Sequence, residues 1–209
     1  LPIGVSGPIW SPKGDRIPFA AEVVPGKTPD ETAAWEKEKA DGWVLLFDGK
    51  TLDGWATSAG KPSKTPVEDG SINPHRCGHY MVVHKDPREN YVLSLDFKIS
   101  KGCNSGVFIR TSSLTPRPGK DVGFNGIEVA IDDTTEAGYH DTGALYDLVK
   151  PSKNAMKPAG EWNRMVVTSN KNKIEVELNG EVVTRMDTTE WAKPNAPPVG
   201  TMHKFDGGL

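Results

Sequence analysis

The sequence lacks the features that identify nucleic-acid-binding, membrane-spanning and zinc proteins. Its 25 Lys and Arg are set against 28 Asp and Glu, so the net charge of −3 provides no basic surface for nucleic acid. No apolar run approaches the ~18–20 residues that a membrane-spanning helix needs. The cysteines and histidines show no zinc-ligand spacing, and there is no phosphate-binding loop, dinucleotide fingerprint or Gly-x-Ser-x-Gly elbow. With 36% hydrophobic residues, the chain is predicted to be a soluble globular protein.

Cysteine is scarce, and the sequence does not open on an export signal. Cys77 and Cys103 each lie near a predicted strand, so one disulfide can form, but two cysteines do not settle whether they pair. The chain begins at Leu1 with neither an initiator Met nor an apolar leader. We therefore expect a mature or trimmed chain that is periplasmic or secreted, its signal peptide having been removed.

Helix signals are confined to one short stretch near the N-terminus. Residues 1–27 contain five prolines and several glycines, which predicts an irregular arm. An N-cap Thr, a first-turn Pro and a capping-box Glu in "TPDE" (28–31) predict a helix over 29–40. We therefore divide the chain into an N-terminal arm with a short helix, residues 1–41, and a β domain, residues 42–209.

From Trp43 onward, apolar residues recur with a period of two, the pattern of β-strands. The clearest example is "YVLSLDFKIS" (91–100), and Asn179-Gly180 predicts a two-residue hairpin turn. Further strands are predicted at 43–49, 107–111 and 126–133, and as a three-stranded meander over 163–186. The pattern predicts an all-β fold, a two-sheet antiparallel β-sandwich or jelly roll with one short N-terminal helix.

Two neighbouring predicted strands, "KGCNSGVFIRT" (101–111) and "GIEVAIDD" (126–133), combine an apolar face with a polar face. The positions predicted to share the apolar, core-directed faces are Ser105, Val107, Ile109, Ile127, Val129 and Ile131. The polar side chains left on the other face are Asn104, Arg110, Glu128 and Asp132, with the small Gly106 and Ala130 between them. Small residues between polar ones predict a hollow that can hold a ligand.

Other interpretations of these polar residues remain open. Arg110 and Glu128 can instead form an ordinary cross-strand ion pair on a solvated face, worth under about 1 kcal/mol. His140 lies in a long polar loop, where it can act with Asp141 or Glu128 as a base or a metal ligand, or can simply be solvated.

Several motifs follow one another along the chain in a characteristic order. They are "GWVLLFDGKTLDGW", "VEDGSI", "YVLSLDFKISKGCNSGVFIR", "GIEVAIDD", "TGALYDL", "KPAGEWNRMVV" and "IEVELNGEVV". In this order they resemble the 3-keto-disaccharide hydrolase family over roughly residues 42–205. Members usually close with a Gly-Leu-Gln-Asp-His segment and an aromatic strand, which we expect to be missing from this chain, since it ends in "MHKFDGGL". They also often carry Gln where Ala130 stands.

The resemblance implies a concanavalin-like jelly roll whose concave sheet binds an oligosaccharide or glycoside oxidised to a ketone at C3. It implies a hydrolase or lyase that removes the C2 hydrogen and expels the glycosidic oxygen from C1. The catalytic residues expected on this basis are Glu128, Asp132 and His140, and the substrate-binding residues are Asn104, Ser105, Phe108, Arg110 and Tyr146. Glu128 is the expected base and Arg110 the expected anchor for the enolate. No cofactor is established, and a divalent metal can replace Arg110 as the electrophile.

Three other functions are compatible with the predicted fold. A jelly roll can be a carbohydrate-binding module without activity, or a structural domain, because fold does not fix function. A conventional glycosidase needs two carboxylates ~5–10 Å apart across the scissile bond. Glu128 and Asp132, four positions apart on one strand, have Cα atoms about 13 Å apart, which disfavours a conventional glycosidase.

Overall fold

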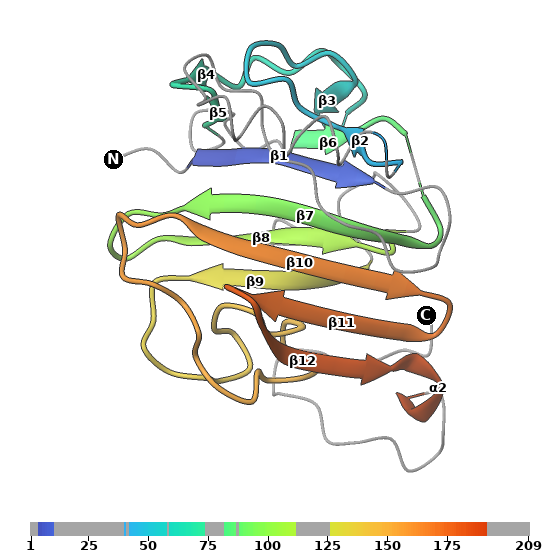
Figure 1. Cartoon of the computed structure of the whole chain (residues 1–209), viewed down its shortest axis with the longest axis vertical. Coiled ribbons are helices and arrows are strands. Elements are labelled where there is room, and N and C mark those ends of the chain that lie inside the picture. The colour runs from blue at the N-terminus through green and yellow to red at the C-terminus, as the bar shows by residue number, and fades with distance from the viewer. Residues whose placement is uncertain are drawn as a thin grey trace.

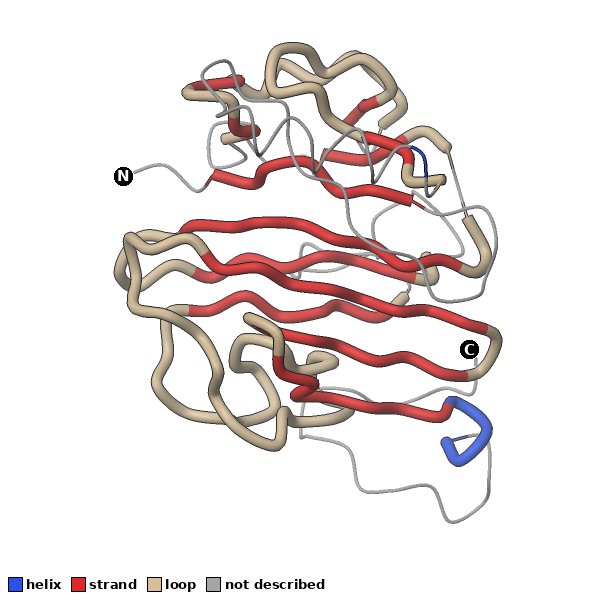
Figure 2. Tube along the Cα trace, in the orientation of Figure 1, coloured by secondary structure: helices blue, strands red, loops and turns tan. Residues whose placement is uncertain are grey.

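The computed structural model of the whole chain describes residues 4–10, 40, 42–57, 59–73, 82–86, 88–111 and 126–191. Strands dominate these residues (Figure 2), which confirms the prediction of an all-β fold. α2 (Thr188–Trp191) is a single helical turn. The predicted helix at 29–40 lies outside the described residues, except for Ala40, which is helical. Within the described ranges, no helix has the length and apolar character required to cross a membrane.

The largest sheet has eight strands in the spatial order β12-β11-β10-β7-β1-β5-β4, with β2 paired to β1 beside this path (Figure 1). Its strands are β1 (Gly4–Trp10), β2 (Val44–Leu45), β4 (Val67–Glu68), β5 (Ser71–Ile72), β7 (Tyr91–Lys98), β10 (Asn163–Asn170), β11 (Lys173–Leu178) and β12 (Glu181–Asp187). The pairs within it are antiparallel.

Two shorter ladders complete the described strands. β3 (Trp55–Thr57) pairs with β6 (Val82–His84), and β8 (Asn104–Ile109) pairs with β9 (Ile127–Asp132). In Figure 1, β8 is seen between β7 and β10, and β9 between β10 and β11. Apolar side chains from β7, β8, β9 and β10 belong to one hydrophobic core. The β8–β9 ladder therefore packs its apolar face on the large sheet.

The local sequence explains the longest strands. In β7 the alternate residues Tyr91, Leu93, Leu95 and Phe97 are all at most 5% exposed, as the period of two predicts. The predicted hairpin at Asn179-Gly180 is confirmed, since it joins β11 to β12. Both of its residues have positive φ, 52° and 87°, which this type of tight turn requires.

The N-terminal arm needs a correction, because residues 4–10 form β1 rather than irregular chain. β1 lies between β7 and β5 in the large sheet. Its pairing with β7 shifts register between Ser6 and Ile9, around Pro8. A bulge is one of the few places where a strand tolerates proline, since no ladder hydrogen bond is needed there. A count of prolines therefore underestimates the capacity of this segment to form a strand.

Candidate functional site

The β8–β9 ladder fixes which side chains share a face. Its register pairs Phe108 with Glu128, Gly106 with Ala130, and Asn104 with Asp132. The alternate residues of β9, namely Ile127, Val129 and Ile131, are at most 2% exposed and belong to the core. Glu128, Ala130 and Asp132 therefore face away from that core, as the alternation predicts. We call this surface the outer face of the β8–β9 ladder.

The side chain of Glu128 lies over Gly106. A Cβ atom built on Gly106 would be 2.7 Å from Cγ and 2.8 Å from Cδ of Glu128, distances that no real contact between carbon atoms adopts. The absence of a side chain at position 106 therefore creates the space that this carboxylate arm occupies. The sequence predicted an open hollow at Gly106 and Ala130. The structure differs, because the Glu128 side chain covers Gly106 and Ala130 is only 2% exposed.

A segment beyond β9 runs along the free edge of that strand. Ala130 N donates to Ala144 O at 2.9 Å, Tyr146 N donates to Glu128 O at 2.8 Å, and Val129 forms an antiparallel bridge with Leu145. This register places Tyr146 directly opposite Glu128, on the side away from Phe108. Phe108, Glu128 and Tyr146 thus lie in one row across three adjacent segments.

His140 makes two contacts, one with Tyr146 of this row and one with Asp147. Its ring stacks on that of Tyr146, with centroids 4.3 Å apart and an interplanar angle of 13°. Its Nε2 is 3.2 Å from Oδ1 of Asp147. The side chain of His140 is 40% exposed, whereas that of Asp147 is 1% exposed. The partly exposed imidazole of His140 therefore contacts the buried carboxylate of Asp147.

Asp147 was not among the residues predicted from the sequence. It adopts φ +59°, and its backbone N–H donates to Tyr139 O at 2.9 Å, which turns the chain back toward His140. The only sequence signal was an Asp seven positions after a His in a polar loop. Such spacing fits neither a helix face nor a strand face, so no periodicity could have selected it.

Arg110 is not opposite Glu128, contrary to the predicted facing. It follows β8 with φ +53°, so the alternation of the strand ends at this residue. Its guanidinium Nε donates to Ser169 Oγ at 3.0 Å, and Nη2 donates to Lys171 O. Tyr91 joins the same group through a hydrogen bond with Ser169, and burial raises the pKa of Tyr91 to about 12. Arg110 therefore ties the end of β8 to the β10–β11 turn.

The remaining predicted residues are spread along the ladder. Asn104 is exposed and pairs with Asp132, which is half-buried at the far end of β9 from Glu128. Thr142 Oγ1 accepts from Asp132 N at 2.8 Å and donates to Asp132 O at 2.7 Å, so the position of Asp132 is fixed. Ser105 pairs with the core residue Ile131 and so shares the other face. These residues are not brought into the row of Glu128.

Cys103 lies beside the same end of the ladder. It is a free and buried thiol, and Cys77 lies outside the described residues. Burial is the largest factor that raises the pKa of the Cys103 thiol, and the negative charges of Asp132 and Asp133 raise it further. Cys103 is therefore held in its protonated, unreactive form.

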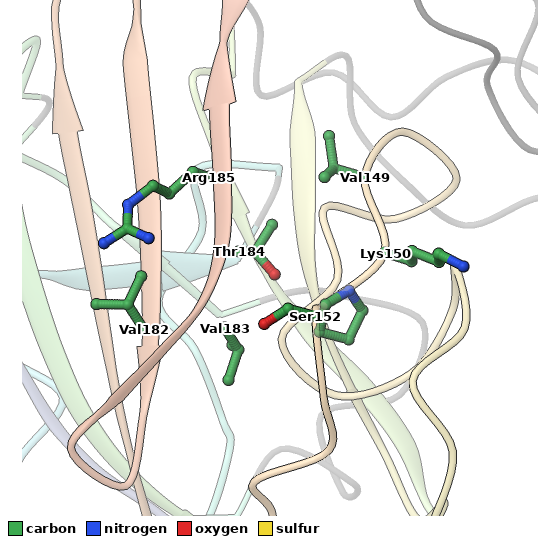
Figure 3. Close-up of a pocket in the computed structure, with 8 residues that line it drawn as sticks. Val149, Lys150, Ser152, Val182, Val183, Thr184 and Arg185 are labelled. Carbon is green, nitrogen blue, oxygen red and sulfur yellow. The ribbon is translucent and has the colours of Figure 1, made fainter.

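Within the described residues, the row that contains Glu128 coincides neither with a candidate metal centre nor with the cavity between residues 149–152 and 182–185. Over the described ranges, no group of three or more His, Cys, Asp or Glu side chains is placed to hold a metal ion. A cavity of about 320 Å³ lies between residues 149–152 and residues 182–185 (Figure 3). None of the predicted site residues lines it, and the charged ends of Lys150 and Arg185 point away from each other. This cavity is therefore separate from the candidate site.

The described structure defines a class of protein. It is an all-β domain that presents a carboxylate, an imidazole and aromatic rings from neighbouring segments of one ladder. Residues 42–206 match the family of 3-keto-alpha-glucoside-1,2-lyase-like domains. The chain belongs to this family, which confirms the resemblance read from its motifs.

Individual relatives agree with this assignment. The chain is 30% identical over 182 residues to the 3-keto-disaccharide hydrolase of Bacteroides thetaiotaomicron, an alignment that covers 73% of this chain and 61% of that protein. The chain thus spans less than two thirds of the relative's length. The crystal structure of a candidate glycosyl hydrolase from Parabacteroides distasonis is 27% identical, with a TM-score of 0.61 and coverage of 73% of this chain and 75% of that one. A second such structure from the same organism is 20% identical, with a TM-score of 0.51 and coverage of 78% and 75%, and shows similarity of fold alone.

Proposed function

We propose that this domain cleaves the glycosidic bond of 3-keto-glycosides or 3-keto-disaccharides, by elimination across C1 and C2 followed by addition of water. The observation that carries the proposal is the position of Tyr146. Its backbone bonds to that of Glu128, and its ring stacks on His140. Tyr146 thereby links a carboxylate and an imidazole, the two kinds of group that proton transfer at a sugar requires. The family membership supports the same chemistry.

The reaction proceeds through an enolate. The ketone at C3 acidifies the hydrogen on C2, so a carboxylate can remove this proton and leave the electron pair delocalised onto the C3 oxygen. Reformation of the carbonyl then expels the glycosidic oxygen from C1, which takes a proton from a general acid and leaves a C1–C2 double bond. Addition of water across this bond gives net hydrolysis. A base, an acid and a hydrogen-bond donor for the enolate oxygen are sufficient.

Glu128 is the proposed base and His140 the proposed acid. Glu128 is held over Gly106, while the guanidinium of Arg110 bonds to Ser169 and Lys171. The enolate donor is therefore reassigned in this proposal from Arg110 to the hydroxyl of Tyr146. Asp132, about 13 Å from Glu128 along the strand, is proposed to contact a more distant part of the sugar, together with Asn104.

We propose that the β8–β9 ladder, extended by the segment that contains Tyr146, is part of the second sheet of a concanavalin-like jelly roll. The packing of its apolar face on the large sheet supports this arrangement. The substrate would then bind on the outer face of the ladder, with Phe108 beside the sugar ring. Action on extracellular glycans would place the protein in the periplasm or outside the cell.

The test uses a chromogenic glucoside oxidised at C3, the same glucoside without oxidation, and a C2-deuterated form of the oxidised substrate. We expect release of the aglycone from the 3-keto substrate only, and loss of the C2 deuterium to solvent. Glu128→Gln should lower kcat/KM by about 10²–10⁴-fold, the usual contribution of a general base. The same assay with a chelator added shows whether a divalent metal contributes to the activity.

Other results would identify the alternative functions. Cleavage of the unoxidised glucoside with retention of C2 deuterium would indicate a conventional glycosidase. Saturable binding of the 3-keto sugar without release of aglycone would indicate a carbohydrate-binding module. Either result would overturn the proposed elimination.

A further inference from the structure

Asp147 combines burial, an unusual backbone conformation and a partly exposed imidazole partner. The residue has a relative exposure of 0%, and its φ of +59° lies in the left-handed region, which Asp adopts more often than most other non-glycine residues. Its carboxylate meets Nε2 of His140, whose side chain is 40% exposed. A buried carboxylate that meets a partly exposed imidazole is the kind of partner that sets which ring nitrogen of a histidine carries the proton.

Three contacts tie the segment of His140 to the segment of Asp147. Asp147 N donates to Tyr139 O at 2.9 Å, the rings of His140 and Tyr146 stack, and the Asp147 carboxylate meets His140 Nε2. The stack fixes the plane of the imidazole, and the carboxylate fixes which edge of the ring points inward. The orientation of His140 is therefore determined by neighbours on a single turn.

We infer that Asp147 is a positioning residue that holds neutral His140 in the tautomer with its proton on Nε2. A carboxylate only accepts hydrogen bonds, so the ring nitrogen that faces it must carry the proton. The other nitrogen, Nδ1, is then the atom that exchanges a proton with substrate. In this respect Asp147 resembles the buried acid of a catalytic triad, which orients a histidine and stays ionised itself.

The proton balance follows from this tautomer. This step rests on the proposed function, although the tautomer itself does not. His140 begins as the imidazolium, with protons on both nitrogens, and Nδ1 gives its proton to the departing glycosidic oxygen. The ring is left neutral with Nε2–H still directed at Asp147. When water adds at C1, Nδ1 takes a proton from that water and Glu128 returns its proton to C2, so both residues regain their starting states.

The test is Asp147→Asn, which keeps the size of the side chain and removes its charge. Ring ¹⁵N chemical shifts report the tautomer at a pH where His140 is neutral, and His140→Gln identifies the resonance among those of the five histidines. We expect the Nε2–H form in the wild type and a shift toward the Nδ1–H form in Asp147→Asn, since a carboxamide can donate to a bare Nε2. With the 3-keto substrate, kcat should fall about 10–100-fold or more while KM changes little. Glu136→Gln, which removes an exposed carboxylate from the same loop, should change neither quantity.

Several outcomes would overturn the inference. A wild-type spectrum with the proton on Nδ1 would do so even if the Asp147→Asn protein failed to fold. An unchanged tautomer in a folded Asp147→Asn protein would do so as well, as would unchanged kcat. If the wild type shows the Nε2–H tautomer and the variant shifts it, but no 3-keto-glycoside is cleaved, the proposed function fails and the positioning role of Asp147 stands.

Discussion

Gly106 and Glu128 occupy space that only a glycine at the first position leaves available. A Cβ atom on residue 106 would lie 2.7 Å from Cγ and 2.8 Å from Cδ of Glu128. The backbone of Gly106 is not in the left-handed region, in contrast to Gly102, whose φ is +71°. The glycine at 106 is therefore required for the placement of the Glu128 side chain and not for the path of the chain.

The first prediction follows from this relationship. In Gly106→Ala the flexible Glu128 side chain must move, because it is the nearest group and can change rotamer. The free energy of unfolding should change by less than about 1 kcal/mol, since alanine fits the backbone conformation. In contrast, kcat/KM for the 3-keto substrate should fall by about 10²-fold, the usual effect of misplacing a reacting group by 1 Å. Denaturant titration and steady-state kinetics measure the two quantities.

Gly102→Ala is the matched control for this prediction. A Cβ atom at Gly102 meets nothing within 4 Å, but alanine is strained at its positive φ. This variant should lose about 1–2 kcal/mol of stability and keep its activity. If Gly106→Ala instead loses stability and keeps kcat/KM, then Glu128 does not act from the position seen in the structure.

The second prediction concerns Arg110, which is expected to stabilise the fold rather than bind sugar. Arg110→Met should cost about 1–3 kcal/mol in the free energy of unfolding, because it leaves the fully buried Ser169 hydroxyl and the carbonyl of Lys171 without their guanidinium partner. KM for the 3-keto substrate should stay within about twofold, since the guanidinium is engaged by these two groups. Arg185→Gln removes an exposed ion pair with Glu175 and should change stability by less than about 0.5 kcal/mol. A large rise in KM without loss of stability in Arg110→Met would restore the sugar-anchor role predicted from the sequence.

Alternation explains why much of the ladder could be predicted. Ile127, Val129 and Ile131 are buried and Glu128 faces the other way, because side chains in a strand alternate whatever the tertiary context. Arg110 does not follow the alternation, because its φ of +53° ends the extended conformation of the strand. An arginine in the sequence does not indicate such a positive φ. The face on which Glu128 lies was therefore predictable, whereas the position of Arg110 relative to Glu128 was not.

The other missed features depend on how the loop that follows β9 folds. The pairing of residues 142–146 with β9 and the approach of Asp147 to His140 are set by how the loop folds back on the ladder. No local propensity encodes such pairing, since loops of this length have many accessible paths. The motifs of the family indicated the proposed substrate class, and the register of β9 placed Tyr146 in the row with Glu128.

The third prediction separates the backbone and side-chain roles of Asn179. This residue has φ +52°, its Oδ1 accepts from Arg164 N at 2.9 Å, and its Nδ2 donates at 2.8 Å to both Ala155 O and Asn163 Oδ1. Asn179→Gly keeps the turn and removes these bonds, so it should cost about 1–3 kcal/mol. Asn179→Ala should cost about 1–2 kcal/mol more, because alanine is also strained at this φ. Equal unfolding free energies for the two variants would show that the turn conformation does not contribute.

The fourth prediction concerns the stability of the protein at acidic pH. His84 packs edge-on against Trp55, with ring centroids 5.1 Å apart, and its Nδ1 accepts a hydrogen bond from Asp86 N at 3.3 Å. Burial lowers the pKa of His84, an effect that the charge of Arg88 reinforces and that of Asp86 opposes. The folded protein thus favours the neutral ring, whereas the unfolded chain takes up a proton near the ordinary histidine pKa of 6.5.

The sign of the effect follows from proton uptake. Well above pH 6.5 the ring is neutral in both states and the stability due to its burial is fully present. As the pH falls through 6.5 the unfolded state binds the proton first, so the free energy of unfolding decreases until the folded-state pKa is passed and then levels off. His84→Gln, which is neutral throughout, should be less stable than the wild type at about pH 7.5 but should lose less stability on titration to about pH 5. Denaturant titrations at the two pH values give the change in the free energy of unfolding for each protein. An equal change for the wild type and the variant would show that His84 keeps its ordinary pKa in the fold.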